Sequence, residues 1–78
     1  MIMDDWKVRI DCLHEYEVKM DLTEKQARKI FNDMKSKMYE KQIVCCELVR
    51  SPIDADGEII VDCFENKDMS FMGHEAVV

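Results

Sequence analysis

The feature that most constrains the fold is a single helical segment, residues 24–41, which lies between stretches of alternating apolar and polar residues. Its apolar residues recur every three or four positions, which predicts one amphipathic helix ending at about Glu40 or Lys41. Thr23 and Gln26 have the spacing of a capping box at its start. One helix covers only one face of a small sheet, so the other face is left without a helix.

The segment before the helix alternates with a period of two, which predicts β-structure. Residues 6–13 put apolar side chains on one face, and residues 16–20 continue with the same parity. Either one long strand runs through His14 and Glu15, or two short strands meet there. We favour a long or kinked strand, because no Gly, Pro or Asn marks a tight turn.

The segment after the helix predicts a β-hairpin. Residues 43–49 and 59–64 alternate, and residues 51–58 between them hold Pro52, Asp54 and Gly57 as turn residues. The predicted fold class is α+β, with a small antiparallel sheet of three to four strands and one helix packed on one face. The order of elements is β(β)-α-β-β.

The sheet face away from the helix is predicted to be apolar. Depending on register, it would hold Ile43, Cys45, Val49, Ile60 and Phe64. Such an apolar face is rarely left exposed to water, so other residues are expected to cover it. A homodimer, a partner on the sheet face, or the chain's own tail would each provide that cover.

With 78 residues, the chain has room for one compact domain, 1–78, without linkers. Residues 66–78 form a weakly patterned tail that is expected to make a short edge strand at Met69 and Phe71, to fold over the sheet, or to be partly ordered. No apolar run is long enough to cross a membrane, and the start is acidic rather than basic and apolar. We therefore expect a cytoplasmic, intracellular protein without a membrane partner.

The four cysteines are expected to be reduced packing residues rather than a metal or redox site. Cys45 and Cys46 are adjacent, and neighbours on a strand point to opposite faces, so they cannot share one ion. No C-x-x-C pair is present. The alternative is a small zinc-dependent regulator that uses Cys12, His14 and either Cys46 or Cys63.

No catalytic motif is apparent, so no enzyme activity, no catalytic residue and no cofactor are predicted. Neither histidine lies near a recognisable nucleophile motif, and no phosphate-binding glycine loop occurs. Asp54, Asp56 and Gly57 resemble part of a calcium loop, but position 63 is a cysteine where the loop needs glutamate. A plain turn is the better interpretation.

The net charge of -6 is uneven: the helical segment 24–41 has a net of +3 and the remainder a net of -9. Such an acidic body favours a protein partner with a basic surface and disfavours direct binding of nucleic acid. The predicted partner-binding residues are Asp54, Asp56, Glu58, Asp62, Glu65, Asp68 and Phe64.

The sequence thus predicts a non-catalytic, small acidic protein-binding module. In kind, and not in any particular residue, it resembles the small accessory proteins of phages and mobile elements, some of which, the anti-CRISPR proteins, block a host nucleic-acid-binding complex. That resemblance implies an antagonist that occupies a basic groove in the host cytoplasm. The alternative is a structural or assembly subunit that forms a homodimer through the uncovered sheet face.

Overall fold

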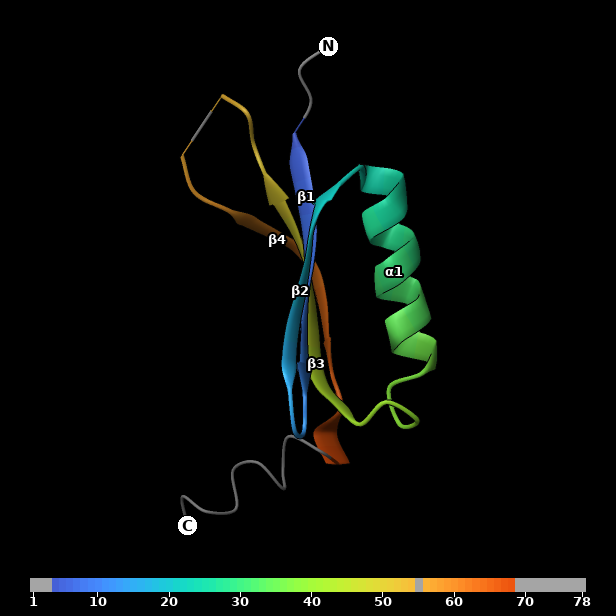
Figure 1. Ribbon diagram of the computed structural model, residues 1–78. Coiled ribbons are helices and arrows are strands. Elements are labelled where there is room, and N and C mark those ends of the chain that lie inside the picture. Colours follow the sequence, from blue (N-terminus) through green and yellow to red (C-terminus); the bar gives the residue numbers. More distant parts are fainter. Residues whose placement is uncertain (1–3, 55, 69–78) are drawn as a thin grey trace.

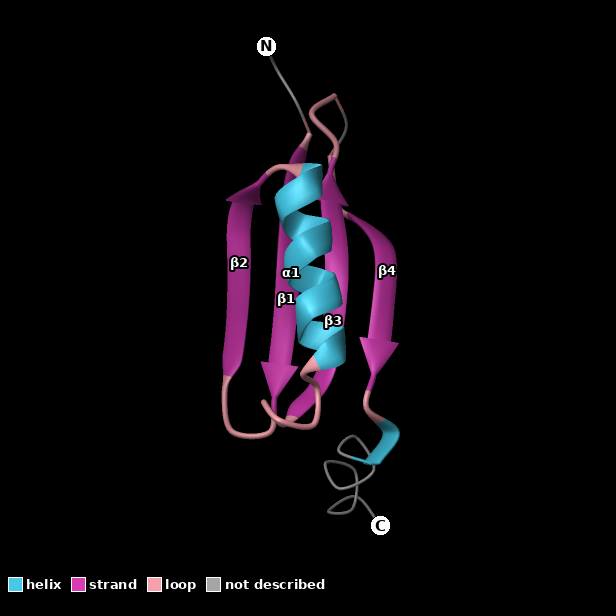
Figure 2. Ribbon diagram, turned by 90° about the vertical axis from the view of Figure 1, so that its right-hand side faces the viewer, coloured by secondary structure: helices cyan, strands magenta, loops and turns pink. Residues whose placement is uncertain are grey.

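The described part of the chain forms a four-stranded antiparallel sheet with one helix packed on one face (Figures 1 and 2). The computed structural model describes residues 4–54 and 56–68. Its elements are β1 (Asp5–Cys12), β2 (Tyr16–Leu22), α1 (Glu24–Ser36), β3 (Ile43–Ser51) and β4 (Ile59–Glu65). The strand order is β2-β1-β3-β4, so β2 and β4 are the edges. The predicted α+β fold class is confirmed.

The segment before the helix is two strands, so the prediction of one long or kinked strand is wrong. Cys12 N–H donates to the carbonyl oxygen of Glu15 at 2.8 Å, and Leu13 and His14 form the turn between them. The turn is tight although it contains no Gly, Pro or Asn. Leu13 N–H donates to the Gln42 carbonyl oxygen at 2.9 Å, which ties the turn to the rest of the fold.

The two-residue turn also explains why residues of equal parity in β1 and β2 lie on opposite faces of the sheet. Over residues 8–11, even-numbered residues of β1 pair with odd-numbered residues of β2, as Ile10 does with Glu17, and Arg9 pairs with Val18. Residues directly opposite each other share a face of the sheet. Val18 therefore lies on the face away from α1, although it has the same parity as the buried Ile10. Val18 and the residues of equal parity beside it therefore face outward. A register shift then brings Leu22 opposite Trp6 on the helix side, where Leu22 packs against the core.

The helix begins as predicted but ends about one turn early. The Thr23 hydroxyl accepts a hydrogen bond from Gln26 N–H at 3.2 Å, and the Gln26 side chain accepts one from Thr23 N–H at 3.0 Å. This reciprocal capping box satisfies two backbone donors. At the other end Ser36 Oγ donates to the Asp33 carbonyl oxygen at 2.8 Å, and α1 stops there instead of at residues 40–41.

The early end allows the chain to return to the core. Residues 37–42 form turns, and Ile43 N–H donates to the Met38 carbonyl oxygen at 2.8 Å. Met38 packs against the core. A helix continuing to Lys41 would carry the chain past the position from which β3 starts.

Two further irregularities in pairing, in β3 and β4, change which residues face the helix. Asp11 pairs with Cys45 whereas Cys12 pairs with Ile43, so Val44 is an extra residue in β3. A bulge of one residue reverses the faces on one side of it. Ile43 consequently lies in the core, and the prediction that it lies on the face away from the helix is wrong.

A second bulge lies in β4. Leu48 pairs with Asp62 whereas Val49 pairs with Ile60, which leaves Val61 as the extra residue. Ile60 therefore shares the face of Val49, away from α1, as predicted. Asp62 shares the face of the buried Leu48.

Phe64 faces the helix, which corrects its predicted position on the opposite face. It pairs with Cys46, is half-buried and makes an edge-to-face contact with Phe31, with ring centroids 5.3 Å apart. The helix lies over β1 and β3 (Figure 2), and both edge strands flank it. The buried apolar core consists of Trp6, Val8, Ile10, Ala27, Phe31, Ile43, Cys46 and Leu48.

The predicted tail falls largely outside the described residues. Met69 and Phe71 both belong to that part, and the described segment ends with Lys67 and Asp68 in helical conformation after a buried Asn66. Within the described residues, no helix is long and apolar enough to cross a membrane.

Candidate protein-binding surface

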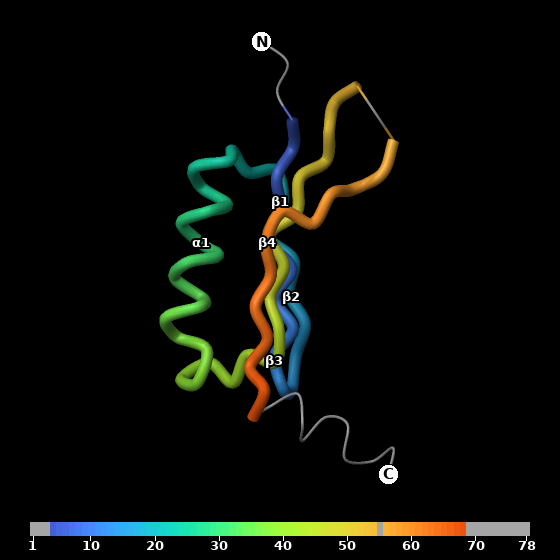
Figure 3. Tube along the Cα trace, turned by 180° about the vertical axis from the view of Figure 1, so that it is seen from behind, coloured from blue at the N-terminus to red at the C-terminus, as the bar shows by residue number. Residues whose placement is uncertain are grey.

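The tip of the β3–β4 hairpin leaves the plane of the sheet and bends away from α1 (Figures 1 and 3). The bend follows the bulge at Val61, because bulges increase the local twist of a strand. Gly57 has φ +98°, a conformation that L side chains rarely adopt, and a Cβ at this position would meet no atom within 4 Å. The glycine is therefore required by the backbone of the turn and not by crowding.

An ion cluster holds this tip against the outer face, by which we mean the face of the sheet that α1 does not cover. The cluster consists of Lys7, Arg9, Glu47 and Glu58. The Glu58 carboxylate pairs with both Lys7 Nζ and Arg9 Nη2. Arg9 Nη1 also donates to Glu47 Oε1 at 3.2 Å. One carboxylate from the hairpin thus bridges two cations of β1.

Interactions within the ion cluster shift the pKa values of two of its members, Glu58 and Arg9. The hydrogen bond from Lys7, with the nearby charge of Arg9, lowers the pKa of the Glu58 carboxyl below its ordinary value of 4.5. The hydrogen bond to Glu47 is the main cause that raises the pKa of Arg9. Val49, which pairs with Lys7, has no exposed surface. The outer face is therefore charged at its centre, and not uniformly apolar as predicted.

A second tether comes from the start of the described chain. Arg50 Nη1 lies 3.5 Å from Asp4 Oδ2, and Ile53 N–H donates to Asp4 Oδ1 at 3.2 Å. Asp4 therefore holds both the last residues of β3 and the turn that follows. The base of the hairpin is therefore held by Asp4 as well as by the ion cluster.

The exposed surface at this end combines apolar and acidic side chains. Ile59, Ile60 and Val61 are consecutive and are 43%, 52% and 39% exposed. In the part of the chain that the structure describes, β4 pairs only with β3, so its other edge has no strand partner. We name the set of residues Asp54, Asp56, Ile59, Ile60, Val61 and Asp62 the β4 edge.

The structure brings three of the predicted binding residues together in this β4 edge. Asp54, Asp56 and Asp62 are exposed, and Asp62 Oδ1 accepts a hydrogen bond from Cys63 N–H at 2.8 Å. Glu58 lies beside them but is engaged in the ion cluster.

The other three predicted residues do not join the β4 edge. Glu65 ends β4, and Asp68 lies beyond it, where its Oδ2 accepts a hydrogen bond from the Tyr39 hydroxyl at 3.3 Å. A strand of this length separates them from the hairpin tip by about 20 Å. Phe64 is half-buried on the helix side, where it packs against Phe31.

Three of the four cysteines are partly or fully buried, and Cys63 is exposed. Burial raises the pKa of Cys46 to about 12, and burial is also the main cause that raises the pKa of Cys12 and Cys45. Protonated thiols are poor nucleophiles and poor metal ligands. Cys63 is exposed and pairs with Glu47 on the outer face, so it cannot share an ion with Cys12 on the helix side. Among the described residues, no three His, Cys, Asp or Glu side chains are grouped as metal ligands.

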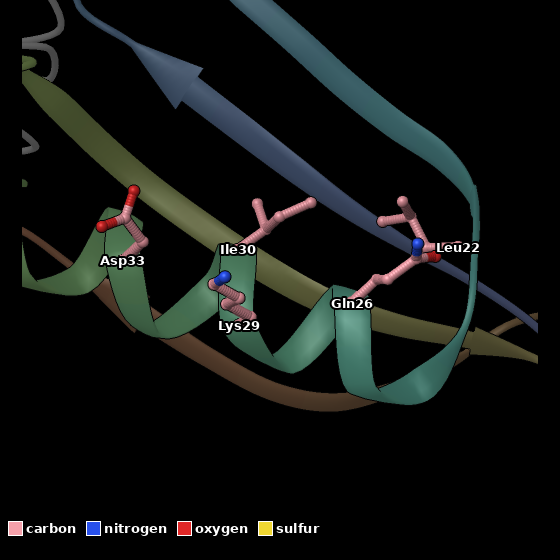
Figure 4. Close-up of a pocket in the computed structure, with 5 residues that line it drawn as sticks. All are labelled: Leu22, Gln26, Lys29, Ile30 and Asp33. Atoms are coloured by element: carbon pink, nitrogen blue, oxygen red, sulfur yellow. The ribbon is translucent and has the colours of Figure 1, made fainter.

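A hollow of about 420 Å³ lies beside the helix (Figure 4). Leu22 comes from the end of β2, and Gln26, Lys29, Ile30 and Asp33 come from α1. Its lining mixes two apolar side chains with one cation, one anion and one amide. This composition favours no particular ligand charge.

No protein-family model matches this chain, and comparisons with curated proteins and with solved structures find no match. Function therefore has to be inferred from the geometry and charge of its own residues. The sequence interpretation missed Lys7, Arg9 and Asp4. The alternation of residues 6–13 placed the two cations on one strand face, but it gave no sign of the carboxylate that bridges them.

Proposed function

We propose that the protein is a non-catalytic binding module that docks onto a basic protein surface through the β4 edge. Three exposed apolar residues and Asp62 lie on an edge strand, next to the exposed carboxylates of Asp54 and Asp56 in the turn before it, and this combination supports the proposal. Apolar surface that remains in water is a common mark of interaction sites. Carboxylates around it steer a basic partner into place and speed association.

The edge strand offers a specific way to dock. An extended segment of the partner can add to the sheet along β4, with backbone hydrogen bonds giving affinity and side chains giving specificity. The ion cluster and Asp4 hold the hairpin before the partner arrives. A surface fixed in advance loses less conformational entropy on binding.

A narrower form of the proposal concerns the partner. A basic surface that complements the β4 edge is of the kind that normally holds phosphate. The module would then act as an antagonist of a nucleic-acid-binding complex, as some phage proteins do. It would compete with nucleic acid without binding it directly, because the chain has a net charge of -6.

The experiment compares two sets of matched substitutions in capture from cell lysate. Asp54→Asn, Asp56→Asn and Asp62→Asn together remove three carboxylates from the β4 edge. The control set, Asp5→Asn, Glu15→Gln and Glu40→Gln, makes the same change in charge at other exposed positions.

A partner that supports the proposal is retained by the control set and lost with the β4-edge set, and its binding weakens steeply with salt. A partner retained equally by both sets would disprove a role for these carboxylates. For the narrower form, added nucleic acid should displace the module from the purified partner. Simultaneous binding of both would refute antagonism.

A further inference from the structure

The opposite edge of the sheet, β2, has a sequence that is complementary to itself. In the described residues β2 pairs only with β1, which leaves its outer edge without a strand partner. Tyr16 and Met20 are 61% and 55% exposed, and Glu17 and Lys19 are also exposed. We propose that two copies of this chain associate through β2 in an antiparallel pair centred on Val18, which joins the two sheets into one.

The turn before β2 fixes which backbone groups point outward. Cys12 N–H donates to the Glu15 carbonyl oxygen at 2.8 Å, so these two residues stand at a hydrogen-bonded position of the ladder. Hydrogen-bonded and non-hydrogen-bonded pairs alternate along an antiparallel ladder, so Glu17 and Lys19 direct their backbone groups toward β1. Tyr16, Val18 and Met20 then direct their N–H and C=O groups to the open edge.

A pair centred on Val18 uses these outward groups. Val18 meets Val18 of the second copy, and Tyr16 meets Met20 at both ends, which makes three hydrogen-bonded pairs and about six backbone bonds. Tyr16, Val18 and Met20 share the outer face, so each aromatic ring would lie beside a thioether, which is a favourable contact. The same set of contacts occurs twice, as a two-fold interface requires.

The charges select this centre over its neighbours. With Val18 at the centre, each Glu17 lies opposite a Lys19 in a non-hydrogen-bonded pair, where side chains approach most closely. Within one chain these two side chains already form an exposed ion pair at 3.2 Å. Two further opposite-charge pairs would form across the interface.

Other centres are unfavourable. A centre at Glu17 or at Lys19 sets that charged residue opposite its own copy. A centre at Tyr16 places Glu15 opposite Glu17. Like charges in direct opposition are destabilising in all three cases. A centre at Met20 requires Asp21 to continue the strand, but Asp21 has φ 61° and is not extended. The edge is therefore complementary to itself in one register.

The two copies would bury a small area, because the shared edge spans residues 16–20. Interfaces at the low end of the size range bind weakly, so we expect a dissociation constant of about 10–100 μM. This proposal concerns a second copy at β2 and is independent of the partner proposed for the β4 edge.

Charge exchange gives a direct test. The Glu17→Lys variant has two lysines on the edge, and the Lys19→Glu variant has two glutamates, so each opposes like charges in its own dimer. A mixture of the two restores opposite charges at both positions. The double variant, Glu17→Lys with Lys19→Glu, restores them within one chain. Lys29→Glu on α1 is the control for the change in charge, since Lys29 is also exposed.

Sedimentation of the full chain from about 5 to 500 μM measures association across the expected range. The wild type, the control and the double variant should rise from 9.2 kDa toward twice that mass. Each single variant should associate about tenfold or more weakly, and their equimolar mixture should recover the wild-type value.

Three results would overturn the proposal: a wild type that stays monomeric throughout, single variants that associate as the wild type does, or a mixture that fails to recover. Circular dichroism of each variant checks that it is folded. If a single variant does not fold, the double variant alone decides, since it should associate like the wild type in the proposed register.

Discussion

The fold is tested most sharply by Ile43 and Ile60. Strand alternation assigns both residues to the outer face, but the structure places only Ile60 there. Ile43 is fully buried in the core, because Val44 is an extra residue in β3. Ile60 lies on the outer face and is 52% exposed. Truncation of either residue to alanine removes the same atoms, so the difference between the two variants reports their surroundings.

We expect Ile43→Ala to lower the free energy of unfolding by about 3.5 kcal/mol, since it loses the full transfer term and leaves a cavity. Ile60→Ala should lower it by about 1 kcal/mol, because roughly half of that side chain is already in water. A chain of this size has a total stability of about 4–12 kcal/mol. Ile43→Val, at about 1 kcal/mol, covers the case in which the alanine variant is unfolded.

The assay is urea unfolding followed by the fluorescence of Trp6. This is the only tryptophan of the sequence, and it is 7% exposed beside the core residues of β1. A two-state fit with a shared slope gives each change in free energy. If Ile43→Ala and Ile60→Ala cost the same, the bulge at Val44 is wrong and plain alternation of β3 is right.

Three further predictions concern the helix, the cysteines and the ion cluster. Thr23→Ala should lower the free energy of unfolding by about 1 kcal/mol by removing the cap, and Thr23→Ser should restore most of it; equal losses would contradict the capping role. A thiol reagent should label the exposed Cys63 in the folded protein and Cys46 only after unfolding, as peptide mapping would show, because burial raises the pKa of Cys46 to about 12. The pKa of Glu58 is lowered on folding, so its ion pairs stabilise the fold above pH 4.5 and are lost as pH falls below that value. Glu58→Gln should therefore flatten the acid limb of the stability curve, and parallel curves for variant and wild type would refute the cluster's role.

The parts of the fold that local signals determine could be predicted from the sequence. The capping box at Thr23 and the apolar spacing of α1 depend on residues within one or two turns. The hairpin after the helix has alternating strands and a turn with Gly57 at positive φ. The end of α1 was missed because residues 37–41 are good helix formers, and only the need to return Ile43 to the core ends the helix sooner.

Pairing between strands could not be predicted in the same way. The bulges at Val44 and Val61 depend on which residue of another strand lies opposite, and no local pattern encodes this. Each bulge moves an apolar residue to the other face, which is why Ile43 and Phe64 were misplaced. The same limit applies to the candidate site, because Arg9 and Glu58 pair across 49 positions of sequence.

The two proposed surfaces lie on opposite edges of one sheet, and this has a consequence for binding. A two-fold axis through Val18, perpendicular to the sheet, keeps both helices on the same face and places a β4 edge at each end of an eight-stranded sheet. The self-associated form would then present two copies of the acidic and apolar surface, facing in opposite directions. Two linked sites bind a repeating or dimeric basic partner far more tightly than one, provided that the spacing allows both to engage. Weak association at β2 would make this gain depend on protein concentration, so that the module binds singly when scarce and doubly when abundant.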